Sequence, residues 1–189
     1  MTLNELAIKT KDKQILIIGE LHGSVQTLKL LKKIIIRMQK EKRMLAIGFE
    51  WSEKMPLMTR TGKFSWEHLT FIQWLKKKQI PIFSFDVKQT KNREKEMAHQ
   101  ILLFQKRMSK NCLLIILTGN QHAKRQQGQM ISYLPNTFSL LLNYKAGYIF
   151  ANGKKLNVKQ ANSLKNENHQ FYDDVWTILY SNAIIPLFK

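Results

Sequence analysis

Acidic, imidazole and amide side chains follow four apolar runs in this chain, at the point where each run ends. These residues are Glu20 and His22 after the first run, Glu50 after the second, Asp86 after the third, and Asn120 and His122 after the fourth. A His or Glu can remove a proton from a water molecule that attacks a carbonyl carbon, and a second His or an amide can stabilise the resulting oxyanion. The set could therefore catalyse hydrolysis if it converges in space.

The acids and imidazoles of this set are also potential ligands for a divalent metal. Such a metal would be held by Glu20, His22, Glu50 and His122. Nitrogen and oxygen ligands of this kind suit Zn, Mn, Fe or Co, and the metal would lower the pKa of its bound water. Their spacing matches no compact metal motif, so hydrolysis with and without a metal both stay open.

Each apolar run is predicted to be a strand of a parallel sheet. The runs are residues 15–18, 44–49, 80–85 and 112–117, and each is bounded by turn or charge signals. They are unbroken rather than alternating, which is typical of strands covered on both faces. Because the carboxyl ends of parallel strands lie along one edge, the polar residues that follow them should meet in one cleft.

Helical patterns separate the predicted strands. Apolar residues recur at helical spacing over 28–38, after a predicted N-cap at Ser24. Residues 66–78 form a second pattern, and the apolar stripe of a third covers 97–108, with Asn111 expected at its end. This alternation predicts an α/β fold, a three-layer α/β/α domain with a mainly parallel central sheet.

The pattern is less regular beyond the fourth strand. We expect a short helix near 129–134, strands near 137–142 and 148–151, a turn at Asn152 and Gly153, and a polar loop over 153–169. Residues 175–180 fit either a last strand or a helix, and periodicity does not decide between them.

Length and composition indicate one globular domain over residues 1–189. The chain is 44% hydrophobic and 23% charged, without an internal repeat or a shift in composition. The lone Cys112 excludes an internal disulfide framework and favours a reducing compartment. Because no signal-peptide pattern or membrane-spanning apolar run is seen, we expect a soluble, cytoplasmic protein.

The chain is strongly basic, with 31 Lys and Arg against 13 Asp and Glu and a net charge of +18. Such a surplus is compatible with nucleic acid, an anionic membrane or an acidic partner. The basic residues are dispersed from Lys9 to Lys189, mostly on predicted helix faces, and no aromatic-interleaved nucleic-acid motif is present. We therefore expect a solvated basic surface without a specific nucleic-acid site, and a small-molecule or peptide substrate. The oligomeric state stays open.

Other reactive side chains are weaker candidates. Cys112 opens an apolar strand and is interpreted as a core residue. His68 and His99 lie in predicted helices and His169 in a polar loop, so we interpret all three as structural or exposed. No nucleophile elbow, phosphate-binding loop, HExxH or dinucleotide motif occurs.

Several short motifs resemble, in their order, the superfamily that unites erythromycin esterases, Tiki-type proteases and ChaN-like haem-binding proteins. They are GELHG, GFE, RxxxMA at residues 93–98, GNQHAK and FSLLLNYKAGYIF, and the closing YDDVWTIL can extend the match beyond residues 15–150. The resemblance implies that the active or binding cleft is lined by Glu20, His22, Glu50 and His122, with Asn120 and Arg93 beside them.

Two departures from the family pattern matter. Many relatives have Asp after the arginine, whereas this chain has Glu94, whose role the sequence leaves open. The chain also lacks the large insertions of the esterase branch, so the resemblance does not imply macrolide substrates.

The family divides between hydrolysis and haem binding. We favour a small hydrolase-like protein that acts on an ester or amide bond. Haem is the alternative cofactor, because an axial His is available and a cleft could be lined by Trp51, Met55, Met58 and Phe64. Core packing of those four residues is the interpretation we favour, and a non-catalytic binding module is a third hypothesis.

Overall fold

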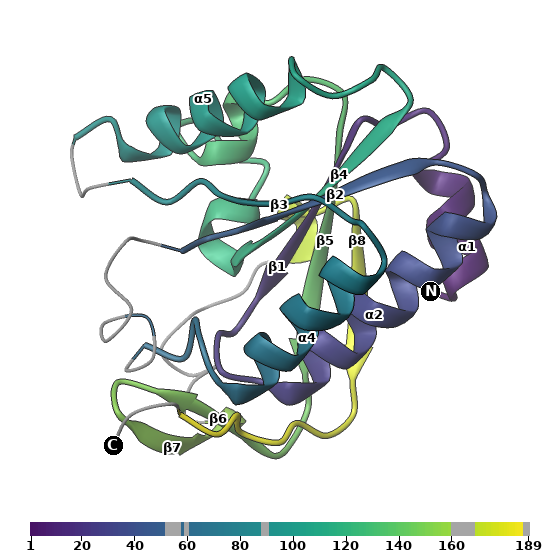
Figure 1. Cartoon of the computed structure of the whole chain (residues 1–189). Coiled ribbons are helices and arrows are strands. Elements are labelled where there is room, and N and C mark those ends of the chain that lie inside the picture. Colours follow the sequence, from purple (N-terminus) through teal and green to yellow (C-terminus); the bar gives the residue numbers. More distant parts are fainter. Residues whose placement is uncertain (52–57, 59–60, 88–90, 160–168, 187–189) are drawn as a thin grey trace.

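The computed structural model describes residues 1–51, 58, 61–87, 91–159 and 169–186. Its central sheet contains β1 (Ile15–Glu20), β2 (Met44–Phe49), β3 (Ile82–Ser84), β4 (Cys112–Gly119), β5 (Thr137–Tyr144) and β8 (Asp174–Ile178). The strand order is β3-β2-β4-β1-β5-β8, and every pair of neighbours is parallel. Helices lie on both faces (Figure 1), which confirms the predicted α/β/α fold.

Two hydrophobic cores join the sheet to its helices. On one face, α1 (Leu3–Lys9), α2 (Val25–Lys40) and α4 (Trp66–Lys77) lie together, and the apolar stripe of α2 is buried there. On the other face, α5 (Arg93–Gln105) packs with the 3-10 turn η2 (Met130–Tyr133). The unbroken apolar strands β1 and β4 are buried along their whole length because both of their faces are covered.

The caps and ends of the helices refine the sequence prediction. Ser24 is the N-cap residue of α2, but its side chain accepts from the Ser181 hydroxyl rather than from the helix backbone. Ser65 caps α4 through its hydroxyl, which accepts from the backbone N–H of His68. Helix α5 ends at Gln105, so the predicted end at Asn111 was wrong; the chain turns out of the helix before Cys112.

The C-terminal half contains a small hairpin at the carboxyl edge of the sheet. Strands β6 (Tyr148–Ala151) and β7 (Lys154–Asn157) pair antiparallel. Asn152 and Gly153 join them, both with positive φ, as a two-residue hairpin turn of the primed type requires.

Two segments in the last third of the chain are strands, β7 (Lys154–Asn157) and β8 (Asp174–Ile178). The prediction of a polar loop from residue 153 was wrong at its start, because β7 occupies 154–157. Cross-strand pairing to β6 overrides the polar composition there. Residues 160–168 of that segment lie outside the described residues. The segment that fitted either a strand or a helix is the edge strand β8. Within the described part of the chain, no helix is long and apolar enough to cross a membrane.

Candidate functional site

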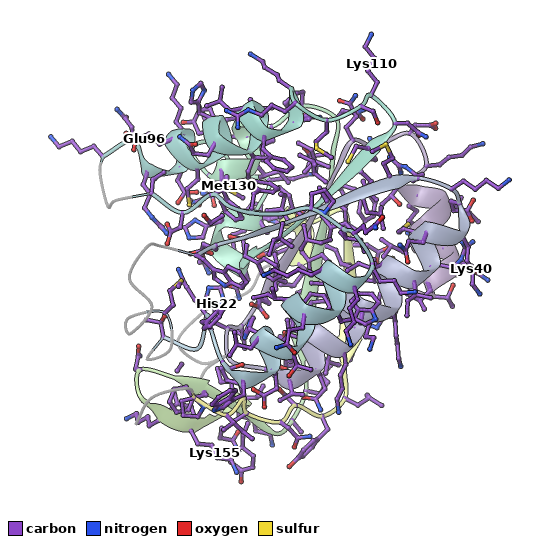
Figure 2. All side chains as sticks on the ribbon, in the orientation of Figure 1. His22, Lys40, Glu96, Lys110, Met130 and Lys155 are labelled. Atoms are coloured by element: carbon purple, nitrogen blue, oxygen red, sulfur yellow. The ribbon has the colours of Figure 1, made fainter. Side chains whose placement is uncertain are left out.

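The parallel sheet brings the predicted polar residues to one edge. Glu20 ends β1, Glu50 follows β2, Asp86 follows β3, and Asn120 and His122 lie in the 3-10 turn η1 (Asn120–Ala123) after β4. A cavity of about 360 Å³ opens among them, and His22, Glu50, Asn120 and His122 line it. Figure 2 shows His22 at this edge, between the sheet and the β6–β7 hairpin.

Glu50 is the hub of the site and is only 4% exposed. Its Oε2 accepts hydrogen bonds from the Thr118 hydroxyl (2.7 Å) and the Gly119 N–H (2.8 Å). Its Oε1 accepts from Lys63 Nζ (2.5 Å) and from Arg93 (3.3 Å). Burial favours the neutral acid, but hydrogen bonds from the two cleft histidines and the charge of Lys63 outweigh it. They hold the pKa of Glu50 well below its usual range.

Glu20 and His22 form a carboxylate–imidazole pair on one side of Glu50. His22 Nδ1 lies 3.0 Å from Glu20 Oε1, and its Nε2 lies 3.6 Å from Glu50 Oε2. Burial opposes a charge on the ring, but the hydrogen bonds to Glu20 and Glu50 prevail and raise the pKa of His22. The Glu20 carboxylate therefore orients the ring and stabilises its protonated form.

Glu94 and His122 form a second pair on the other side of Glu50. His122 Nδ1 lies 2.7 Å from Glu94 Oε1, while Glu94 Oε2 accepts the backbone N–H of Met130 at 2.9 Å. Burial again opposes the charge, but hydrogen bonds to Glu50 and Glu94 raise the pKa of His122 to about 9. The sequence left the role of Glu94 open, and the structure shows that its side chain reaches from α5 to the His122 imidazole.

His122 Nε2 has a different partner in each protonation state. When protonated, it faces Glu50 Oε1, 3.5 Å away. When neutral, it can accept from Arg93 Nη1, 3.2 Å away. Loss of the Nε2 proton therefore exchanges a carboxylate acceptor for a guanidinium donor, and both states of the ring have a partner.

Two cations and Asp86 complete the polar wall. Arg93 donates to Asp86 Oδ1 at 2.6 Å, and Lys63 Nζ lies 3.6 Å from Asp86 Oδ2. Burial opposes the charge of Arg93, but the contacts with Asp86 and Glu50 raise its pKa. Asp86 thus holds the cations that contact Glu50. Sequence reasoning missed Lys63, since it follows no strand and looks like any other lysine of a basic chain.

Gly119 lies between the two imidazoles. A Cβ at this position would be 3.2 Å from His22 Nε2 and 3.7 Å from His122 Cδ2. A side chain there would crowd the His22 ring and would be in ordinary contact with the His122 ring. The Gly119 N–H donates to Glu50. Next to it, the backbone carbonyl of Asn120 accepts from the hydroxyl of Tyr172, in the YDDVWTIL segment.

The other wall of the cavity is apolar and comes mainly from the hairpin. Its residues are Leu21, Ile149, Ala151 and Leu156. The hairpin is fixed against the end of β1 because Phe150 N–H donates to the carbonyl of Gly23 at 3.0 Å. Gly23 has a φ of +89°, and a Cβ there would be 1.9 Å from the Phe150 oxygen, so only glycine allows this approach.

The metal and haem hypotheses require free nitrogen and oxygen ligands. Among the described residues, no group of three or more His, Cys, Asp or Glu side chains is arranged to hold a metal ion. The Glu50 oxygens face Lys63, Arg93 and the Gly119 N–H instead. The pKa of His122 is about 9, so haem ligation through its Nε2 would have to displace a proton at neutral pH. As placed, the carboxylates and imidazoles of the cleft are paired with one another and with cations, and both cofactors stay predictions.

The residues expected to be structural lie away from the cleft or in the core. His68 is buried, with its Nδ1 2.9 Å from the Ser65 hydroxyl, and burial lowers its pKa to about 3. His99 and His169 are exposed. Cys112 is buried, and burial raises its pKa, as expected of a core thiol.

The aromatic residues considered for a haem cleft pack against one another. The ring of Trp51 stacks on Phe49 with centroids 4.0 Å apart and meets Phe64 edge-on at 5.2 Å. Met58 and Phe64 are 5% and 3% exposed. Trp51 and Phe64 thus pack in the core and Met58 is buried, but the three residues also line a cavity of about 560 Å³ beside Phe85; Met55 lies outside the described residues.

The sequence matches no family model and no curated protein. Two of the similar solved structures are effector proteins. The first is RRSP, a MARTX toxin effector domain from Vibrio vulnificus CMCP6, with 15% identity, a TM-score of 0.46, and coverage of 65% of this chain but only 30% of that one. The second is the type III effector HopBA1, with 12% identity, a TM-score of 0.46, and coverage of 75% of this chain and 82% of that one. Membership of the erythromycin esterase, Tiki and ChaN superfamily stays a prediction from the motifs.

Proposed function

We propose that this protein is a hydrolase that activates water for attack on an ester or amide bond. The observation that carries the proposal is the Glu20–His22 pair, in which Nδ1 is held at 3.0 Å by a carboxylate while the ring lines the cavity. A base held by an orienting acid is the arrangement that general base catalysis needs. In its neutral form, His22 takes the proton of the attacking water through Nε2, and Glu20 stabilises the imidazolium that forms.

His122 acts as the acid in this mechanism. Its pKa of about 9 keeps it protonated at neutral pH, so it can give the Nε2 proton to the leaving group. Arg93 then becomes the partner of the neutral Nε2. The partners of both rings favour the protonated form, so the base role of His22 falls to its neutral fraction, which grows as the pH rises, while His122 supplies the acid.

Glu50 holds the two imidazoles rather than acting as the base. Its low pKa and its four donors make it a weak proton acceptor. It also keeps Lys63 and Arg93 beside the cleft, where they offset the charge of the carboxylates. We assign Glu20, His22 and His122 to the chemistry, Asn120 to oxyanion binding, and Glu50, Asp86 and Arg93 to positioning.

The cavity also points to a class of substrate. Its volume of about 360 Å³ is at the small end of ligand sites, and one wall is apolar. A short acyl chain or an apolar peptide side chain beside the scissile bond fits such a site. The neutral cleft, in which each acid faces a base, does not select for an anionic substrate despite the basic surface.

The test is a substrate screen on the purified protein and three matched histidine variants. Carboxyl esters, phosphoesters and small amides are assayed with the wild type, His22→Ala, His122→Ala and the exposed control His99→Ala. Elemental analysis first measures the metal bound to each purified protein. Each assay is then run with and without a chelator. We expect turnover to be lost in the two cleft variants and kept in the control. Stoichiometric haem binding without hydrolysis would overturn the proposal, and inertness of the wild type towards every substrate would favour a binding module.

A further inference from the structure

Helices α2 and α4 lie side by side and form one outer face of the molecule (Figure 1). A shallow pocket of about 300 Å³ lies between them, and its apolar part is formed by Leu28, Phe71 and Trp74. Trp66 lies at its edge and is 55% exposed. The backbone N–H of Trp66 donates to Ile185, whose side chain is 61% exposed, so two large apolar side chains are presented together.

Cationic side chains surround this pocket. Lys29 and Lys32 line it directly, and Lys32 Nζ lies 4.9 Å from the centroid of the Trp74 ring. Every charged residue of α2 is Lys or Arg, and the one acid of α4, Glu67, accepts the backbone N–H of Ile185. The exposed lysines of the two helices and the α4 cap are Lys29, Lys32, Lys33, Lys40, Lys76, Lys77 and Lys78.

The helical spacing places these charges on a common surface. Lys29, Lys32, Lys33 and Lys40 recur at the spacing of one helix face, with the half-exposed Ile36 among them. The sequence shows these lysines as scattered along 50 residues, whereas the packing of α4 beside α2 places Lys29 and Lys32 next to Trp74. Lys76 is the exception, because it lines a different pocket on the other side of α4. We define this surface as the α2–α4 face.

We propose that the α2–α4 face docks on an anionic phospholipid surface, with Trp66 and Ile185 in the interface and the surrounding lysines on the lipid phosphates. A surface of dispersed lysines around exposed aromatic and aliphatic anchors matches the charge and polarity of such a bilayer. Most of its cations are lysines, which act as point charges. A specific anion site more often uses arginine, whose guanidinium binds a phosphate or carboxylate through two parallel hydrogen bonds. The one arginine of α2, Arg37, is paired with Glu41.

The geometry favours a lipid surface over nucleic acid or an acidic protein. A nucleic-acid groove places aromatic rings for base stacking along a basic track, whereas Trp74 is already covered by Lys32 and the exposed Trp66 lies at the end of the face. The proposal does not depend on hydrolysis in the cleft, because none of its residues lines the cavity.

The experiment is vesicle flotation of the full chain with phosphatidylcholine vesicles, with and without phosphatidylserine, at low and physiological salt. The test variant is Lys29→Glu/Lys32→Glu. The charge-matched control is Lys106→Glu/Lys110→Glu, whose residues are exposed on the opposite side of the sheet, where Figure 2 labels Lys110. Equal melting temperatures establish that both variants fold.

We expect binding only to vesicles that contain phosphatidylserine, weakened at least tenfold by Lys29→Glu/Lys32→Glu and much less by the control. Binding should shift the tryptophan emission to the blue, and Trp66→Ala should remove most of that shift. Three results would overturn the proposal: no flotation, equal loss in the control pair, or tighter binding to an oligonucleotide or acidic peptide than to the vesicles.

Discussion

The Nδ1 atom of His122 lies 2.7 Å from Oε1 of Glu94, which places a second carboxylate–imidazole pair opposite the pair of Glu20 and His22. The two rings come from different strand ends, and both Nε2 atoms face the same buried carboxylate, Glu50. Glu94 also accepts the Met130 N–H, so the acid is fixed from two sides. Because Glu94 belongs to α5, this helix positions one of the two imidazoles at the carboxyl edge of the sheet.

Glu94→Gln should lower the pKa of His122 from about 9 towards its ordinary value near 6.5. The amide can still accept the Nδ1–H, but it removes the negative charge that favours the protonated ring. The ring C–H signals of His122, followed by NMR across pH 5–10, report this directly. Glu94→Asp is the control, because it keeps the charge, and a titration unchanged in Glu94→Gln would assign the raised pKa to Glu50 alone.

Folding stability should fall as the pH rises from about 6.5 to about 9. The folded pKa of His122 is raised to about 9, so the folded state holds this proton more tightly than the unfolded state does. Its contribution is complete below the unfolded pKa near 6.5 and is lost as the pH passes the folded value, and the raised pKa of His22 acts in the same direction. We expect a loss of about 3 kcal/mol in urea unfolding between pH 6 and pH 9.5.

His122→Gln should remove most of that slope. The glutamine cannot titrate, so over the same interval the unfolding free energy of the variant should lose only the contribution of His22. A slope identical to that of the wild type would show that other groups cause the pH dependence.

The central fold could be predicted from the sequence because its signals are local. The apolar runs of β1, β2 and β4 are buried on both faces, so each shows as an unbroken hydrophobic segment. Strand β7 gave no such signal, since a polar segment becomes a strand only when it pairs with β6. The end of α5 at Gln105 was missed because the apolar pattern of 97–108 continues past it.

The candidate site was predictable where residues follow strands. Glu20, His22, Glu50 and His122 each lie at or just after a carboxyl end, and parallel pairing brings such ends together. Lys63 could not be found in this way, because it reaches Glu50 from a segment without a strand. The ion pair of Lys63 with Glu50 forms only when the chain folds, and the spacing of the two residues in the sequence does not predict it.

His68 should make the protein sensitive to acid. Its folded pKa is about 3, because burial disfavours the charged ring, whereas the unfolded value is near 6.5. The stability that the neutral ring contributes is present above pH 6.5 and is lost as the pH falls towards 3, by a few kcal/mol at most. The amide of His68→Asn can still form a hydrogen bond with the Ser65 hydroxyl, and it cannot titrate in this range. The variant should be less stable at pH 7 but lose less between pH 6.5 and 4 in denaturant unfolding; an unchanged acid slope would contradict the prediction.

Ala151→Phe should shorten the preferred acyl chain. Ala151 lies on the apolar wall of the cavity, so a phenyl ring there would occupy part of the 360 Å³ volume. With an ester series of increasing chain length, KM should rise mainly for the longer substrates while kcat for the shortest is kept. Lys155→Phe adds the same ring to the outer side of the hairpin, where Lys155 lies over Tyr148, and should leave the series unchanged. An equal loss for every chain length in Ala151→Phe would show that the wall does not contact the substrate.

Glu20→Gln should damage turnover without damaging the fold. The glutamine oxygen can still accept the Nδ1–H of His22, so the orientation of the ring is kept, but the charge that stabilises the imidazolium is lost. Glu20 is 5% exposed, and a buried carboxylate is held there at a cost in stability, so the melting temperature should be unchanged or raised. We expect kcat to fall about 10²-fold or more with a small change in KM, measured alongside thermal unfolding. Glu41→Gln, in an exposed ion pair with Arg37, is the control and should change neither property strongly. A large drop in melting temperature with turnover intact would instead make Glu20 a structural acid that holds the end of β1.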